Sequence, residues 1–301
     1  MSTGTKRIVV GVDVGGTFTD MFFLDEVDGT CEVVKVPTTR DDQSRGIQQG
    51  IDRTLGGLTD VATIVHGTTV ATNALLERKG ARTGLITTRG FRDVLEMRRR
   101  DRPDTWGLWG TFTPLIARDF RLEVDERVLA DGTCTVSIDP AQVTQAARQL
   151  RAQGAESICV FFINAYANDH NERMAVEAVR AMWPNPHVTA SHEILPEIRE
   201  FERASTASLN AYLQPTIGDY LGQLERRLRD GGLTGNILIV QSNGGVMTID
   251  TACRLPVRTA LSGPAAGVIA SAHIARSAGI DNIITCDMGG TSLDVSVIIK
   301  G

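Results

Sequence analysis

One eight-residue pattern occurs twice in the chain, once near each end. Residues 13–20 read DVGGTFTD and residues 287–294 read DMGGTSLD, so both copies fit D-x-G-G-T-x-x-D and start 274 residues apart. Each copy lies between two apolar, β-branched stretches, which is typical of two strands joined by a glycine turn. Two matched copies in the same context predict two similar hairpins with a shared chemical role, and two ordinary Gly-Gly hairpins are the alternative.

The residue types of this pattern suit the binding of phosphate groups. Adjacent glycines let backbone amides approach an anion because no β-carbon blocks them, and threonine adds a hydroxyl donor. A carboxylate at a strand end can hold Mg²⁺ or its water shell. We therefore predict catalytic, magnesium-holding carboxylates at Asp13 and Asp287, and phosphate contacts from Gly15, Gly16, Thr17, Gly289, Gly290 and Thr291.

The last aspartate of each copy is open to two interpretations. Asp20 and Asp294 can close the turn by accepting hydrogen bonds from backbone amides. They can equally take part in holding the metal ion.

Composition excludes several classes of protein. The chain has 301 residues with 42% apolar and 22% charged residues, which is the balance of a protein with packed cores. A net charge of -5 gives no broad positive field for nucleic acid. No apolar run approaches the roughly 18 to 20 residues of a membrane span. We expect a cytoplasmic protein without nucleic-acid or membrane partners, and five reduced cysteines in its core.

Strand and helix patterns alternate along the chain, which predicts an α/β fold. Prolines near residue 185 favour a division into two regions, residues 1–185 and residues 203–301, with one hairpin in each. The apolar spacing predicts a helix over residues 91–99 and two helices over residues 203–213 and 216–229.

A second candidate site follows the predicted strand over residues 62–66. The sequence HGTT comes next, before a predicted helix, and open α/β sheets bind ligands at such strand ends. A helix N-terminus also favours a carbonyl or carboxylate oxygen. We predict substrate or γ-phosphate contacts from His66, Thr68, Thr69 and Asn73, and a plain capped helix start is the alternative.

The paired hairpins resemble those of the actin, Hsp70 and sugar-kinase superfamily. In that superfamily, two ribonuclease-H-like domains each provide a phosphate hairpin, called phosphate 1 and phosphate 2, and ATP binds between them. The resemblance implies a first ribonuclease-H-like domain and an incomplete second one in this chain.

Longer stretches are similar to the A subunit of the hydantoinase/5-oxoprolinase family, which includes N-methylhydantoinase A and the related acetone carboxylase beta-type subunit. The matching stretches are residues 10–20 (VGVDVGGTFTD), 66–78 (HGTTVATNALLER), 88–95 (TRGFRDVL), 200–204 (EFERA), 241–245 (QSNGG) and 261–267 (LSGPAAG). The resemblance assigns residues 1–185 to the family's N-terminal domain and residues 203–301 to the start of its second domain.

The resemblance implies an ATP- and Mg²⁺-dependent hydrolase that phosphorylates the carbonyl of a cyclic amide, such as a hydantoin or 5-oxoproline, and works with a B-type subunit. Phosphorylation turns a poor leaving oxygen into a good one, so ring opening becomes favourable. An acetone carboxylase-type subunit, a small-molecule kinase and an ATP-driven reactivase or chaperone of the same fold are the alternatives.

The chain is shorter than the A subunits that it resembles. A subunits are more than twice its length, and residue 301 comes shortly after the second hairpin. We therefore expect the isolated chain to bind ATP weakly or not at all. We also expect uncovered apolar surface around the second hairpin, which favours aggregation.

Overall fold

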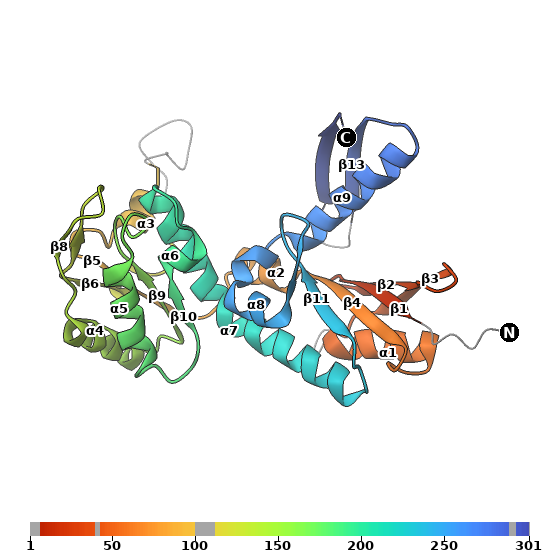
Figure 1. Ribbon diagram of the computed structural model, residues 1–301, viewed down its shortest axis with the longest axis horizontal. Helices are drawn as coiled ribbons and strands as arrows, with labels where there is room; N and C mark the ends of the chain where they lie inside the picture. Colours follow the sequence, from red (N-terminus) through yellow and green to blue (C-terminus); the bar gives the residue numbers. More distant parts are fainter. Residues whose placement is uncertain (1–6, 40–42, 100–111, 289–292, 301) are drawn as a thin grey trace. The chain divides into compact units, whose positions relative to one another are not determined.

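The computed structural model describes residues 7–39, 43–99, 112–288 and 293–300. Contacts divide the chain into two compact units, which we call unit 1 (residues 1–78 and 217–301) and unit 2 (residues 79–216) (Figure 1). Each unit contains a sheet and helices, which confirms the α/β class. Unit 1 combines both ends of the chain. The predicted division into the consecutive regions 1–185 and 203–301 describes the order of the sequence and not these two units, so it stays a prediction.

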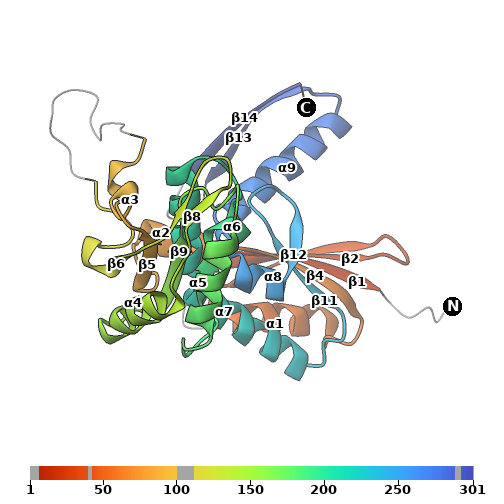
Figure 2. The ribbon, with the colours of Figure 1, turned by 60° about the vertical axis from the view of Figure 1, so that its left-hand side comes forward.

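Unit 1 has a six-stranded sheet in the order β12-β11-β4-β1-β2-β3. The strands β1, β2 and β3 form an antiparallel meander, β4 pairs in parallel with β1, and β11 pairs in parallel with β4 (Figure 2). The strands are β1 (Ile8–Val14), β2 (Phe18–Asp25), β3 (Cys31–Pro37), β4 (Val61–Thr68), β11 (Asn236–Val240) and β12 (Val246–Thr248). The helices α1 (Gln43–Leu55), α2 (Val70–Leu76) and α8 (Ile249–Arg254) belong to the same unit.

Helix α1 packs closely on the meander. Its Ile47 and Ile51 are fully buried, and so is Met21 of β2. A β-carbon on Gly50 would lie 2.3 Å from the terminal methyl carbon of Met21, so a larger residue at this position would displace the end of the Met21 side chain. The predicted first hairpin is confirmed, and α1 fixes which face of it is buried.

A single helix, α7 (Glu200–Asp230), replaces the two helices predicted over residues 203–213 and 216–229. Pro215 lies inside it, where the ring removes one N–H donor and normally ends a helix. Buried side chains line the helix on both sides of the proline, and they include Ala204, Ala207, Ala211, Ile217, Leu221 and Leu224. Tertiary packing therefore outweighs the local preference to break. No described helix combines the length and apolar character that a membrane span requires.

Replacing Pro215 with alanine is expected to stabilise the chain by about 1–3 kcal/mol, because the helix regains a hydrogen bond and loses a ring clash. Urea unfolding of Pro215→Ala and of the neighbouring control Thr216→Ala measures the difference. Equal stability of the two variants would contradict the expectation.

Unit 2 has a four-stranded parallel sheet in the order β10-β9-β5-β6. A core under α4 and α5 fills one face, and Ala204, Ala207 and Ala211 of α7 pack on the other. The elements are β5 (Thr83–Thr88), α3 (Val94–Met97), β6 (Arg121–Val124), β7 (Arg127–Val128), β8 (Cys134–Val136), α4 (Pro140–Ala152), β9 (Ser157–Phe161), α5 (His170–Arg180), β10 (Val188–Ala190) and α6 (Ser191–Ile194).

The helix predicted over residues 91–99 is shorter than expected. Only α3, with four residues, is helical. Arg98 follows it with φ +51°, a conformation outside the right-handed helical region, so the helix ends there.

Helix α9 (Ser262–Ser277) leads into the predicted second hairpin, which is confirmed as β13 (Asn282–Met288) and β14 (Leu293–Ile299). Three cross-strand pairs form an exposed apolar face, which we call the free face: Ile284 with Val297, Cys286 with Val295 and Met288 with Leu293. Ile284 is 73% exposed and Val297 is 64% exposed.

The cysteines differ from the prediction in their placement. All five are free thiols, but Cys31, Cys134 and Cys286 are exposed and only Cys159 is fully buried. The three exposed cysteines lie at solvent-facing positions of the strands β3, β8 and β13. Residue type alone therefore does not predict whether a cysteine is buried.

Candidate functional site

The first hairpin presents an open turn at the end of β1. The amide of Gly15 donates to the carbonyl of Phe18 over 3.0 Å and closes the turn. A β-carbon on Gly15 would lie only 3.1 Å from that carbonyl oxygen, whereas one on Gly16 would meet nothing within 4 Å. Gly16 and Thr17 are exposed, so the predicted phosphate-binding residues of this copy remain accessible.

The two hairpins share their strand register. Asp13 pairs with Asp20 across β1 and β2, and Asp287 pairs with Asp294 across β13 and β14. The repeat therefore extends from residue types to backbone pairing. Gly289, Gly290 and Thr291 lie outside the described residues, so their predicted phosphate contacts stay predictions.

Asp13 lies among carboxylates. Partial removal from water raises the pKa of Asp13, and the charges of Asp20 and Asp287 raise it further. Asp20 is 3.0 Å from the Nζ atom of Lys35, but the described residues give Asp13 no ion-pair partner. The fold thus brings Asp13 and Asp287 close enough for their charges to interact, and a cation there would relieve the repulsion.

The residues predicted at the end of β4 divide into buried and accessible groups. His66 and Thr68 are fully buried, Thr69 is half-buried and Asn73 is exposed. The hydroxyl of Thr69 donates to the carbonyl of Val14 over 3.2 Å, which ties β4 to β1. A direct ligand contact is open to Thr69 and Asn73, whereas His66 and Thr68 would first have to leave their packed positions.

His66 has a structural partner that the sequence does not indicate. Its Nε2 atom lies 2.7 Å from the hydroxyl of Tyr220 in α7. Burial lowers the pKa of His66 to about 4, so the ring is neutral at pH 7. The side chain joins β4 to α7 inside unit 1, and a role toward substrate stays a prediction.

This neutral imidazole predicts a pH dependence of stability. The folded pKa lies below the ordinary value of 6.5, so the unfolded chain binds the proton more readily. His66 therefore stabilises the fold fully above pH 6.5 and progressively less as the pH falls toward 4. We expect about 2 kcal/mol of stability to be lost between about pH 7 and pH 5 through this group.

Urea unfolding of the wild type and of His66→Gln at both pH values tests this expectation. Glutamine keeps an amide for Tyr220 but does not titrate, so the variant should lose less stability on acidification. An identical loss in both proteins would exclude His66 as the cause.

Helix α9 begins beside Asp13. Its second residue is Gly263, on which a β-carbon would lie 3.8 Å from Oδ1 of Asp13. The buried hydroxyl of Ser262 donates to the carbonyl of Thr68 over 3.2 Å, and the amide of Leu261 donates to Thr72 over 2.9 Å. Sequence analysis missed Ser262 and Thr72 as site residues, although the matching LSGPAAG stretch contains Ser262.

The donor set fits a hydrated magnesium ion better than an ion enclosed by protein. Among the described residues, no group of three or more His, Cys, Asp or Glu side chains is placed to hold a metal. Mg²⁺ commonly uses one or two carboxylates with waters and phosphate oxygens. Asp13 and Asp287, beside an accessible glycine turn, are compatible with that arrangement.

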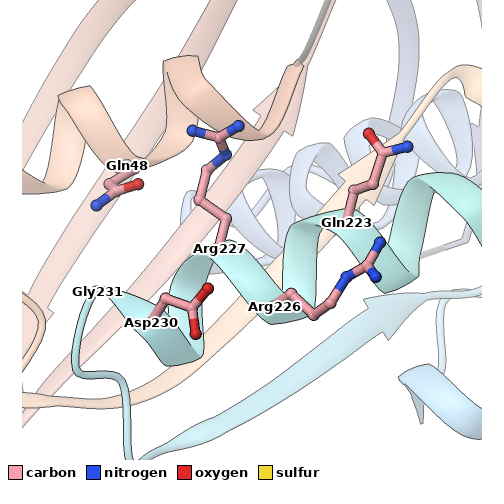
Figure 3. A pocket seen from close by; sticks show the side chains of 6 residues that line it. All are labelled: Gln48, Gln223, Arg226, Arg227, Asp230 and Gly231. Atoms are coloured by element: carbon pink, nitrogen blue, oxygen red, sulfur yellow. The ribbon is translucent and has the colours of Figure 1, made fainter.

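A separate cavity of about 490 Å³ lies along α1 and the last turns of α7 (Figure 3). Gln48, Gln223, Arg226, Arg227, Asp230 and Gly231 line it. None of these is a predicted site residue, and Arg227 already donates to Ser44 over 2.7 Å. We therefore place the candidate site at Asp13 and not at this cavity.

The fold and the repeat define an α/β protein in which the first and last aspartates of each D-x-G-G-T-x-x-D copy pair across two antiparallel strands of one compact unit. The hydantoinase/oxoprolinase N-terminal region matches residues 9–183, and the hydantoinase/oxoprolinase region matches residues 203–301. The chain belongs to the hydantoinase/oxoprolinase family, as the resemblance implied.

Three relatives illustrate the similarity. Caprolactamase subunit alpha of Pseudomonas jessenii is 34% identical over 96% of this chain and 43% of its own length. The crystal structure of the ATP-dependent caprolactamase from that organism matches with a TM-score of 0.83. 5-Oxoprolinase 1 of Arabidopsis thaliana is 32% identical over 95% of this chain and 25% of its own length.

The third relative is acetone carboxylase, an enzyme of ATP-dependent acetone carboxylation, in a nucleotide-free structure. It matches with a TM-score of 0.87 at 28% identity, over 98% of this chain and 44% of that chain. The present chain thus spans less than half the length of these relatives.

Proposed function

We propose that the whole protein is the A-type subunit of an ATP-dependent cyclic amidase, which phosphorylates the carbonyl of a hydantoin, 5-oxoproline or related lactam and so prepares the ring for hydrolysis. The observation that carries this proposal is the matched Asp-Asp register of the two hairpins, and the charge of Asp287, which contributes to raising the pKa of Asp13, supports it. The relatives support the substrate class, because their names include 5-oxoprolinase and caprolactamase.

Each group in the site has a role in this proposal. Asp13 and Asp287 hold Mg²⁺ and its waters, while Gly15, Gly16 and Thr17 contact phosphate oxygens, with Gly289, Gly290 and Thr291 in the second hairpin. Bound ATP supplies the phosphoryl group, and bound Mg²⁺ neutralises charge on it. Thr69 and Asn73 are the accessible candidates for contacts on the substrate side.

The ribonuclease-H-like fold and the B-type partner belong to the same proposal. The antiparallel meander continued by parallel β4 and β11 supports the first, because it places the hairpin turn at the end of a central strand. Names of relatives as subunits support the second. We also propose a cytoplasmic location.

ATP hydrolysis by the whole protein with its B-type partner tests the proposal. We expect 5-oxoproline, a hydantoin or caprolactam to stimulate ATP hydrolysis and to be opened, the two lactams to amino acids and the hydantoin to an N-carbamoyl amino acid. Stimulation by acetone with bicarbonate instead would favour an acetone carboxylase-type subunit, the second candidate that the acetone carboxylase match supports. Hydrolysis that responds to none of these compounds would contradict both.

A further inference from the structure

Two glycines from different elements border the same oxygen of Asp13. Gly67 lies in β4 directly opposite Asp13 in β1, and Gly263 is the second residue of α9. A β-carbon on Gly67 would lie 3.5 Å from Oδ1 of Asp13, and one on Gly263 would lie 3.8 Å from it. Both elements therefore leave space beside this oxygen that any other residue would fill.

Hydrogen bonds between the elements hold this space in place. Ser262 donates to the carbonyl of Thr68, next to Gly67, and the amide of Leu261 donates to Thr72 in α2. Thr69 donates to the carbonyl of Val14, next to Asp13. The first turn of α9, the end of β4 and the end of β1 are thus joined around the carboxylate, and the two glycines keep fixed positions.

We infer that Gly67 and Gly263 are specificity-determining residues, which keep room beside Asp13 for the water shell of a magnesium-bound polyphosphate. This rests on the proposed function. Mg²⁺ gives up its waters reluctantly, so a carboxylate that binds it needs space for those waters. The positive end of α9 opposes a bare cation but favours phosphate oxygens, so the ligand class is the magnesium–polyphosphate pair.

The distances allow alanine at both positions without rebuilding the fold. Separations of 3.5 and 3.8 Å are ordinary van der Waals contacts, and neither glycine has a positive φ. A methyl group at either position would therefore remove space for water at Oδ1 while the backbone stays in place. The effect on ligand binding can be separated from an effect on folding.

Each variant has a matched control in the same element type. Gly11→Ala in β1 controls for Gly67→Ala, because its β-carbon would contact Phe22 at 3.8 Å and not Asp13. Gly267→Ala in α9 controls for Gly263→Ala, because its β-carbon would meet nothing within 4 Å. Both α9 variants gain helix propensity, so their thermal midpoints should stay equal or rise.

Calorimetric titration of the whole protein with magnesium pyrophosphate measures the effect. Pyrophosphate supplies the polyphosphate without requiring contacts to adenosine. Loss of a water bonded to a charged group predicts at least about tenfold weaker binding by Gly67→Ala and Gly263→Ala, with both controls like the wild type.

Equal affinity in all five proteins, or no binding by the wild type, would overturn the inference. A wild type that binds magnesium pyrophosphate, with the expected pattern among the variants, supports it even if the whole protein hydrolyses no ATP. In that case only the proposed function fails. Pyrophosphate binding thus tests the role of the two glycines, and ATP hydrolysis tests the proposed function.

Discussion

Replacing Asp13 with asparagine is expected to lower ATP hydrolysis by the whole protein by about 10²–10³-fold. Asparagine keeps the shape of the side chain but removes the charge that would hold Mg²⁺ at the end of β1. Asp287→Asn should produce a loss of similar size, because Asp287 holds the same position in the second hairpin and its charge reaches Asp13. Steady-state ATP hydrolysis at saturating Mg²⁺ measures both effects.

Asp20→Asn provides the comparison within the same hairpin. Asp20 already has an ion-pair partner in Lys35, and its charge raises the pKa of Asp13. Its removal should change the rate much less if Asp20 only supports the turn. Normal ATP turnover in either Asp13→Asn or Asp287→Asn would refute the metal assignments. A loss in Asp20→Asn as large as in Asp13→Asn would place Asp20 at the metal as well.

The second large effect concerns self-association through the free face. Three cross-strand pairs place apolar side chains together on one side of β13 and β14, and contiguous exposed apolar surface on a two-stranded sheet favours aggregation. We expect the 301-residue chain to associate at micromolar concentrations. The double variant Ile284→Lys with Val297→Glu should be predominantly monomeric, because it places an opposite-charge pair on that face.

Light scattering coupled to size exclusion measures the association. Val27→Glu is the control, because Val27 is 61% exposed in the turn after β2 and lies outside the free face. The control should associate like the wild type. Association that persists in the double variant, or disappears in the control, would show that another surface is responsible.

The site illustrates how far local chemistry can be read from sequence. The D-x-G-G-T-x-x-D repeat predicted two hairpins, and alternating burial in β1 and β2 follows from the alternating sequence. The magnesium-holding role of Asp13 and Asp287 is also predicted from residue type and position in the repeat. The nearness of Asp13 to Asp287 could be proposed only through resemblance, because no local rule relates residues 274 positions apart.

Other features of the site depend on packing between elements. The sequence HGTT predicted a ligand contact for His66, but α7 buries the ring against Tyr220. That Gly67 and Gly263 both border Asp13 becomes apparent only when β4 and α9 are placed side by side in the fold. Such contacts join residues that are distant in the chain, so the periodicity of one element does not reveal them.

The sequence by itself determined the α/β class, the two glycine hairpins and the membership of the family, because residue alternation, turn chemistry and motif spacing are local properties. Only the tertiary structure decided that α7 runs through Pro215, that residues 1–78 and 217–301 form one unit, and that His66 is buried. The physical reason is that burial energy summed over many distant contacts exceeds the local preference of a single residue.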